Sequence, residues 1–541
     1  MFDIIRDSTF GTLVNHLTGG RVLPYRDQLP NYQIPERYLK SLRDSTVPSS
    51  PATRVPSFVE GDVAKKDPEA AHIKLDPYIV DWDGDDDPDN PHNWSSGKRS
   101  FVLFSICVLT FSIYIGSAIY TPSIPGIMKD FGVSSVVATL GLSLYVLAYG
   151  IGPMVGPVPL QELPSLGRNP VYMITLLIFV LLQIPTALAP NIGSLLVLRF
   201  LSGFFASPAL ATGGASIQDI YAPQYLAYTI GLWAMSAVAG PVTGPIVGGF
   251  AAQKEGWRWP LWELLWISGF SFVFLFFLFP ETYPDTILLK RARRLRKLTG
   301  NPNLRSLSEI KQAQMSPSAV AQEALIRPFQ LMMEPAVFSS TSISDVSIFT
   351  ITIFITTRIH VLFPTHAVWF EAFPLVFVDI YHFKLGVSGL PFIGIIVGAV
   401  WMRTGGFPPE ERLKLAIVSG FAIPISLFIF GWTSRPSVHW IAPVIGAAIY
   451  MPGIYLLFQC VLVYLPMAYP HHAASVYAAN DFFRSTLASA FPLIGRAFFH
   501  NLGIGPGCSL LAGIALGMIP ILYLLMRRGA TLRAHSKYAT A

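Results

Sequence analysis

Residues 240–249 read GPVTGPIVGG and lie inside an apolar stretch that runs from 226 to 250. Its glycines recur at four-residue spacing, so in a helix they share one face and leave a groove that a second helix can approach closely. Its prolines remove backbone donors and favour a bend in that helix. The pattern fits ordinary small-residue packing, and it also fits a hinge about which a helix could rock. The residues of the motif are Gly240, Pro241, Gly244, Pro245, Gly248 and Gly249.

The apolar stretch around this motif is one of a series that covers most of the chain. Of the 541 residues, 52% are hydrophobic and only 13% are charged, about half the charged share of a soluble protein. This composition excludes a soluble enzyme, and runs of roughly 20 apolar residues predict membrane-spanning helices. The first six spans are predicted at 101–121, 136–158, 170–189, 194–217, 226–250 and 260–279. Six more are predicted at 346–364, 367–402 (with a short break near 380–385), 413–432, 438–464, 473–498 and 508–526.

Basic residues beside the spans predict the orientation of the chain. The segment 290–297 holds six basic residues in eight, Lys98 and Arg99 precede the first span, and Arg527 and Arg528 follow the last. With twelve spans these sites share one side, which the positive-inside rule makes cytoplasmic. We therefore expect an all-α integral membrane protein with twelve transmembrane helices in two halves of six. Its expected parts are a cytoplasmic, largely disordered N-terminal tail (1–100), the first half (101–279), a basic central loop (280–333), the second half (334–526) and a cytoplasmic C-terminal tail (527–541).

An acidic cluster, DWDGDDDPDN at 81–90, precedes the first span. One interpretation is a calcium loop, but the spacing and the terminal glutamate of a calcium-binding hand are missing. We interpret the cluster as a solvated acidic linker. Its aspartates are Asp81, Asp83, Asp85, Asp86, Asp87 and Asp89.

Two halves of six helices around a central loop are typical of transporters, which expose a midplane site to each side in turn. A channel is more often an oligomer of short chains with a ring of identical residues. The sequence has no Walker loop, no nucleophile paired with a base and no metal-ligand spacing, which argues against an ATP-driven pump, an enzyme and a metal site. We expect the lipid bilayer and a small-molecule substrate as partners, no nucleic acid, no cofactor, and an ion gradient as the energy source.

Ionisable residues inside membrane spans are costly and usually face a cavity or a partner. The candidates for binding protons or substrate are Arg199, Glu371, Asp481 and Arg484, and Glu263 is a weaker one. Glu371 could carry the transported proton or contact a cationic substrate. Asp481 and Arg484 are three residues apart and share a helix face, so a purely structural ion pair is the alternative for them.

The loop between the second and third spans carries opposite charges at the expected cytoplasmic boundary. Glu162 and Arg168 lie there, Gly167 precedes the arginine, and Asp219 at the end of the fourth span could join them. Such a cluster can latch helix ends together in one state and release them in another. The alternative is a set of surface salt bridges that contributes little.

Apolar and aromatic side chains along the spans would suit amphipathic organic molecules as the cavity wall. The residues that we expect to line it are Trp233, Tyr455, Gln459 and Phe491, with Trp369 and Phe370. For each of them alone, a place in the core or against lipid is the alternative.

Several of these segments resemble the fungal drug:proton antiporters with twelve spans in the major facilitator superfamily. GPVTGPIVGG is similar to the antiporter motif of that family, and residues 199–203, RFLSG, are similar to its RF-x-x-G element. Residues 156–157 (Gly-Pro), Glu162 and residues 167–170 (Gly-Arg-Asn-Pro) resemble a fungal variant of its loop signature, although Glu162 replaces the more usual aspartate.

The resemblance implies proton-coupled efflux of drugs or of a fungal secondary metabolite by alternating access. It implies a role for Arg199 in proton coupling and for the loop signature in conformational switching. It also implies a major facilitator fold, a multi-pass protein of the plasma membrane more than of the vacuole, and a functional monomer driven by the proton gradient.

Two segments depart from the family pattern. Residues 338–366 look too long and contain charges that fit poorly in a lipid-facing helix, and residues 400–410 look too short. Misplaced exon boundaries in the predicted gene would explain both, and a real insertion is the alternative. The departure leaves two other functions open, a non-transporting sensor or defective relative, and an importer of the same superfamily.

Overall fold

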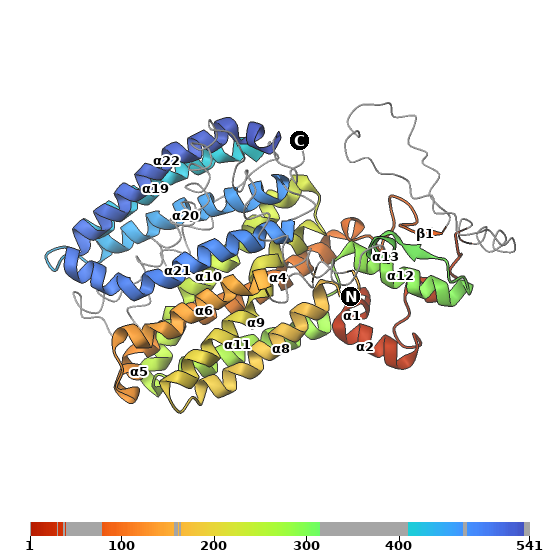
Figure 1. Ribbon diagram of the computed structural model, residues 1–541, viewed down its shortest axis with the longest axis horizontal. Coiled ribbons are helices and arrows are strands. Elements are labelled where there is room, and N and C mark those ends of the chain that lie inside the picture. The colour runs from red at the N-terminus through yellow and green to blue at the C-terminus, as the bar shows by residue number, and fades with distance from the viewer. Residues whose placement is uncertain are drawn as a thin grey trace.

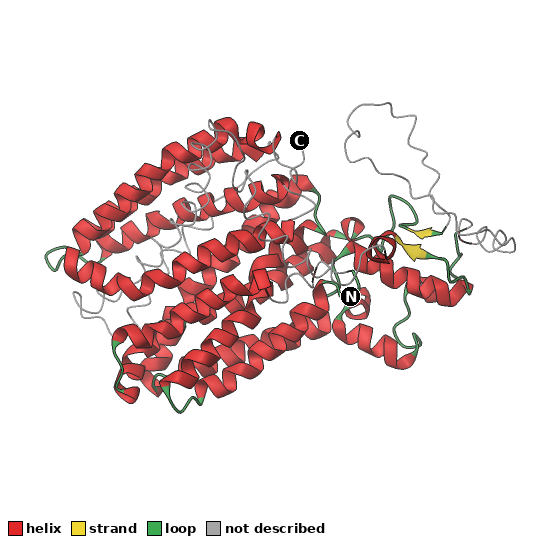
Figure 2. Cartoon of the chain, viewed as in Figure 1, coloured by secondary structure: helices red, strands yellow, loops and turns green. Residues whose placement is uncertain are grey.

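The computed structural model describes residues 2–29, 31–35, 38, 78–155, 161, 164–313, 409–468 and 473–534. These residues are mostly helical, and the long helices lie side by side in a bundle with short elements at one end (Figures 1 and 2). Within the described residues, seven helices are long and apolar enough to cross a membrane. They are α4 (Ser96–Ala118), α6 (Ser135–Val155), α8 (Arg168–Ala187), α9 (Ile192–Gln218), α10 (Pro223–Glu255), α11 (Trp259–Leu278) and α20 (Ile441–Ala468).

The first half of the bundle contains a helix at each of the six predicted spans, from α4 to α11. Side-chain caps set several starts, since Ser95 accepts from the backbone N–H of Lys98 at α4 and Asn191 accepts from that of Ser194 at α9. After α4 the chain continues through η3 (Thr121–Ser123) and α5 (Ile124–Phe131). The helix ends differ from the predicted span ends by a few residues.

The second half is described for its last four predicted spans only. These form α19 (Pro409–Thr433), α20, α21 (Ala473–Leu502) and α22 (Ile504–Ala534). The spans predicted at 346–364 and 367–402 lie outside the described residues. The total of twelve spans therefore stays a prediction, with which the described helices are consistent.

The glycines of the 240–249 motif hold α10 against α4. A Cβ added at Gly240 would lie 2.8 Å from the backbone nitrogen of Ile115, and one at Gly244 would lie 2.7 Å from that of Ile119. One at Gly248 would lie 2.6 Å from the carbonyl oxygen of Ile119. The groove predicted from the four-residue spacing is therefore filled by the α4 backbone. Both internal prolines of the motif lie within α10, which runs unbroken through them.

Short elements at one end of the bundle pack together, and we call them the basic-end module. They are α1 (Phe2–Asp7), α2 (Thr9–Thr18), η1 (Arg26–Gln28), β1 (Ile79–Val80), η2 (Pro91–Asn93), α12 (Pro284–Thr299), β2 (Arg305–Ser306) and α13 (Leu307–Ala313). Strand β1 pairs in parallel with β2, and Val80 packs beside Leu295 of α12 in a small apolar core. The end of the bundle that carries this module is called the basic end below (Figure 1).

The N-terminal tail differs from its predicted state. Residues 2–29, expected in a largely disordered tail, form α1, α2 and η1, and the acidic cluster touches α12. The buried Asp87 carboxylate accepts from Arg291 at 2.5 Å, and Asp83 contacts the same guanidinium. The interpretation as a solvated linker is wrong for Asp87, whose carboxylate is buried against Arg291, while Asp83 pairs with the same arginine and stays exposed.

Candidate functional site

Arg199 lies fully buried in the middle of the first half, between α4, α6 and α9. Its Nε donates to the carbonyl oxygen of Gly141 at 3.1 Å, and its Nη2 donates to that of Gly116 at 2.9 Å. The guanidinium also sits 4.7 Å and 4.4 Å from the ring centres of Tyr120 and Tyr145. Carbonyl dipoles and aromatic faces thus replace water around this charge. Among the described residues it has no carboxylate partner, and its Nη1 has no hydrogen-bond partner.

The glycine four residues after Arg199 has a packing role. A Cβ added at Gly203 would collide with the backbone of Tyr145 in α6. The RF-x-x-G element therefore combines the buried cation with the close helix approach that encloses it.

Asp481 and Arg484 form a buried ion pair on α21, and the pair reaches across to the first half. Arg484 Nη2 contacts Asp481 Oδ1, and it also donates to the Tyr114 hydroxyl of α4 at 2.8 Å. The Ser485 hydroxyl donates to the same carboxylate at 3.4 Å. The second carboxylate oxygen, Oδ2, is buried without a hydrogen-bond partner in the described part of the chain. Tyr114 lies roughly five helical turns from the start of α4, so this contact is far from the basic end.

Three tyrosines connect the two buried arginines. The rings of Tyr145 and Tyr149 on α6 are 5.9 Å apart, and those of Tyr149 and Tyr114 are 6.0 Å apart. Tyr145 faces Arg199, while Tyr114 bonds to Arg484. Each ring pair has the tilted or edge-to-face geometry that aromatic contacts favour. A continuous aromatic path therefore joins the cation of the first half to the ion pair of the second.

The predicted latch residues meet at the basic end. Arg168, the first residue of α8, contacts Asp219 at the end of α9 through Nε at 2.5 Å and Nη2 at 3.2 Å. Burial raises the pKa of the Asp219 carboxyl to about 6, although the Arg168 charge opposes this shift. The desolvation penalty therefore offsets much of the attraction between the two charges. Separating the two helix ends would rehydrate both groups, so the ion pair adds little to the cost of opening this contact.

Glu281 is a central residue of this region that the sequence patterns did not single out. Its buried carboxylate accepts from the backbone N–H groups of Arg168 at 3.1 Å and Asn169 at 3.3 Å, the first two of α8. It also accepts from those of Thr282 and Tyr283, both at 3.1 Å. The carboxylate thus caps α8 from 113 residues away, where helix polarity favours a negative charge.

Gly167 is required by this cap. Its φ of 80° lies in the left-handed region, and a Cβ there would collide with the Glu281 carboxylate. The glycine of the predicted loop signature therefore lets a charged cap approach the helix start.

The N-terminal helices are tied to the same region. Lys98 Nζ contacts Asp7 at 2.9 Å, and the backbone N–H of Glu281 donates to the Asp7 carbonyl at 3.2 Å. Although burial alone would raise the pKa of the Asp7 carboxyl, the charges of Lys98 and Arg6 lower it. The Thr9 hydroxyl donates to the side chain of Asn169, so the tail, α8 and the segment after α11 meet at one place.

The predicted cavity-lining residues lie mainly at contacts between the halves. Trp233 is buried, with its ring centre 6.1 Å from that of Tyr477 in the second half, and the Tyr455 hydroxyl donates to the carbonyl oxygen of Gly231 at 2.8 Å. Gln459 lies beside the same glycine. The side chain of Phe491 is outside the described ones. As predicted binding residues all four remain untested.

Other predicted site residues fall outside the described part of the chain. Glu162 of the latch, Glu371 of the proton site, and Trp369 and Phe370 of the cavity wall lie there. The structure therefore assembles Arg168 with Asp219, and Asp481 with Arg484, and leaves the places of the other four as predictions.

The comparison with known proteins identifies the family. Residues 106–493 match the family model described as Major Facilitator Superfamily. The chain belongs to the major facilitator superfamily. The resemblance drawn from the motifs of α9 and α10 is thereby confirmed, and so is membership of a transporter family.

Relatives of this facilitator cover most or all of its length. It is 44% identical to the transporter mfs1 of Schizosaccharomyces pombe, over 85% of this chain and 88% of that protein. It is 40% identical to the cycloheximide resistance protein of Candida maltosa, over 100% of both chains.

A solved structure supports the fold of this facilitator. The crystal structure of the human organic anion transporter MFSD10 (TETRAN) matches with a TM-score of 0.57 at 14% identity, over 79% of this chain and 100% of that one. At this identity the likeness shows the fold alone. The predicted major facilitator fold is thus confirmed.

Proposed function

We propose that this facilitator exports small amphipathic organic molecules from the cytoplasm in exchange for protons, by alternating access across the plasma membrane. The name of the Candida maltosa relative, a cycloheximide resistance protein, supports export of drug-like compounds. The observation that carries the proton-coupled part is the buried pair of Asp481 and Arg484, bonded to Tyr114 of the other half. Intramembrane ionisable groups at such a contact are typical of proton relays.

Protonation of Asp481 would change the contact between the halves. The ionised carboxylate neutralises the Arg484 guanidinium, which in turn binds the Tyr114 hydroxyl. A proton on the carboxyl removes the negative charge and leaves the guanidinium without its counter-ion in a water-poor site. The arginine then gains by turning away from Tyr114 toward a substrate, and its hold on α4 weakens. Proton binding thereby biases a two-state contact between α21 and α4.

The same carboxylate offers a reason for exchange rather than co-transport. A cationic substrate group and a proton are alternative partners for Asp481, whose buried Oδ2 has no hydrogen-bond partner among the described residues. Occupation by the substrate excludes the proton, and the reverse holds as well. Because both ligands compete for one carboxylate, binding of each lowers the affinity for the other by the same factor. Arg199 contributes a positive charge at the other end of the path formed by the three tyrosines.

The test uses the purified full chain in liposomes with an imposed pH gradient. Uptake of labelled cycloheximide and of a lipophilic cation would be compared for wild type, Asp481→Asn, Tyr114→Phe and Glu255→Gln. Glu255 is exposed at the end of α10, so its variant controls for loss of one carboxylate. We expect Asp481→Asn to lose proton-driven exchange by about tenfold or more, which corresponds to about 1.4 kcal/mol of coupling.

A second readout separates coupling from folding. Exchange of labelled for unlabelled substrate without a pH gradient should survive in Asp481→Asn, because it needs alternating access and no proton. Loss of both reactions in this variant, with intact folding, would contradict the assignment of Asp481 to protons. Substrate movement in the same direction as protons would indicate an importer, and no movement in wild type would favour the non-transporting alternative.

A further inference from the structure

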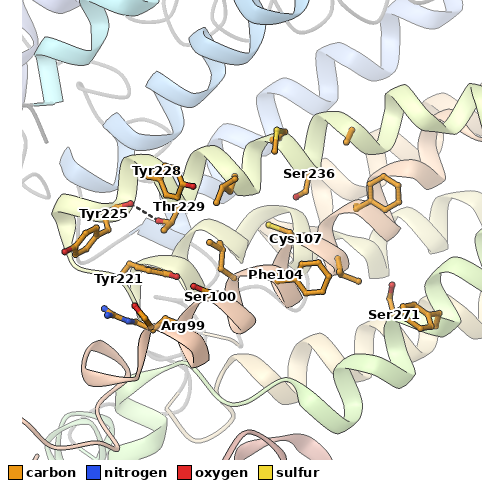
Figure 3. Close-up of a pocket in the computed structure, with 18 of the residues that line it drawn as sticks. Arg99, Ser100, Phe104, Cys107, Tyr221, Tyr225, Tyr228, Thr229, Ser236 and Ser271 are labelled. Atoms are coloured by element: carbon orange, nitrogen blue, oxygen red, sulfur yellow. Dashed lines mark hydrogen bonds between the residues drawn. The ribbon is translucent and has the colours of Figure 1, made fainter. Parts of the chain in front are cut away.

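A groove on the side of the first half lies apart from the buried charges described above. It has a volume of about 1100 Å³ and is bounded by α4, α10 and α11 (Figure 3). This volume is at the upper limit of pockets for drug-sized ligands, which span roughly 300–1,000 Å³. Its walls are apolar, and Phe104, Trp266 and Phe270 are more than half exposed along it.

The groove is closed toward the inside of the bundle and toward the far end. On its side away from the basic end, the glycines of the 240–249 motif bring α10 against α4. On its side facing the bundle interior, the hydrogen bond from Trp233 to Thr110 joins the same two helices. Between these contacts and the basic end, α4 and α10 leave a gap, and α11 borders this gap on its third side. The groove therefore opens to the lipid and to the basic end.

Its mouth at the basic end is polar and positively charged. Arg99 lies there, 5.6 Å from the ring centre of Tyr221, and its Nε is buried without a hydrogen-bond partner. Ser96, Ser100 and Tyr225 also line this part of the groove, as Figure 3 shows for the last two. In the described part of the chain no carboxylate forms a salt bridge with Arg99. Within that part of the chain, the Arg99 guanidinium therefore has no counter-ion.

We propose that this groove binds one anionic phospholipid, with its phosphate at Arg99 and an acyl chain along the aromatic wall of α11. Two features of the groove select this occupant. The unpaired guanidinium matches a phosphate oxygen in charge and hydrogen-bond geometry. The apolar walls match an acyl chain, and basic pockets between transmembrane helices recognise anionic headgroups. A bound lipid would act as a wedge between α4 and α10, the two helices that the glycine motif holds together.

Native mass spectrometry of the full chain tests this proposal. Delipidated protein in detergent would be titrated with phosphatidylserine or phosphatidylcholine, for wild type, Arg99→Gln and Arg293→Gln. Arg293 is exposed on α12, so its variant removes the same charge away from the groove. We expect wild type and Arg293→Gln to retain one phosphatidylserine about tenfold more tightly than phosphatidylcholine. Arg99→Gln should lose this preference.

A groove-filling variant makes the test independent of charge. Leu232→Trp would place an indole in the groove and leave Arg99 intact. We expect it to lose the bound phosphatidylserine as well. Equal retention of both lipids by wild type, or an unchanged preference in Arg99→Gln, would overturn the proposal. Binding of a cationic amphiphile that Arg99→Gln leaves unaltered would assign the groove to substrate instead.

Discussion

One carboxylate, that of Glu281, satisfies backbone donors from two separate parts of the chain. It accepts from the start of α8 and from the turn that follows α11, and its own backbone N–H holds the end of α1. Because these segments carry the Arg168 side of the latch, the cap positions that arginine against Asp219. Removing the Glu281 carboxylate should therefore affect folding first, and the contact between Arg168 and Asp219 second.

We predict that Glu281→Ala lowers the free energy of unfolding by about 1.5–3 kcal/mol, because hydrogen bonds to a charged acceptor are lost and buried N–H groups remain. Thermal unfolding of the purified chain in detergent measures this change. Glu281→Gln keeps one carbonyl acceptor and should fall between wild type and alanine. Glu255→Ala removes an exposed carboxylate and should differ little from wild type. A Glu281→Ala protein as stable as the Glu255→Ala control would contradict the role of the cap.

Residue types indicated the site only where the partners lie close in sequence or in a known motif. Arg168 with Asp219, and Asp481 with Arg484, were expected together and are in contact. The bond of Arg484 to Tyr114 was missed, because 370 residues separate the two and tyrosine is common in apolar spans. Periodicity reports the face of one helix and says nothing about which helix packs there.

At the scale of elements, α10 combines a tight seam with two internal prolines. Its glycines contact the α4 backbone, and the motif's Thr243 hydroxyl donates to the carbonyl oxygens of Ala239 and Gly240 at 2.9 Å and 3.1 Å. These are local bonds to the carbonyls three and four residues earlier, a common partner of a threonine hydroxyl inside a helix. At the motif itself the seam is a contact between glycines and backbone, and the hydrogen bond from Trp233 to Thr110 joins the same two helices.

We predict that Gly244→Ala reduces transport and stability together, because its Cβ would lie 2.7 Å from the backbone nitrogen of Ile119. The α4 backbone cannot yield as a flexible side chain would, so α10 must move outward. We expect a cost of about 1–3 kcal/mol, as for overpacking in a dense core. Substrate efflux from intact cells and thermal unfolding of the purified protein measure the two effects.

Gly513 on α22 provides the matched control, since a Cβ there meets nothing within 4 Å. Gly513→Ala should be neutral or stabilising by up to about 1 kcal/mol, the helix-propensity gain of alanine over glycine. Equal behaviour of the two variants would mean that the seam between α4 and α10 is not close in the working protein.

The elements were predictable to different degrees for a physical reason. Membrane spans follow from length and hydrophobicity, and the ten helices that match predicted spans end close to where the apolar runs end. The basic-end module was missed because its stability comes from charge pairs between distant segments. Asp27 with Arg294, and Asp87 with Arg291, each join partners about 200 residues or more apart. The acidic cluster and the basic loop are complementary in charge, and matching them would have predicted the contact.

At the scale of the whole molecule, contacts between the halves extend from the middle of the bundle to the basic end. Ser485 of α21 packs on Gly150 of α6, and the ring of Tyr477 on α21 covers Gly214 of α9. The Tyr455 bond to α10 lies at a similar level. This arrangement corresponds to a state in which the basic end is closed. Transport then requires Gly214 and Tyr477 to separate in each cycle.

We predict that a reversible link between these two positions stops transport. In Gly214→Cys/Tyr477→Cys, the second substitution removes the ring that a Cβ at 214 would meet, so both thiols fit in the closed state. A short methanethiosulfonate cross-linker should abolish substrate exchange in liposomes, and dithiothreitol should restore it. Each single variant treated with the same reagent controls for modification alone. Full exchange by completely cross-linked protein would mean that the basic end stays closed throughout the cycle, and alternating access between these halves would have to be abandoned.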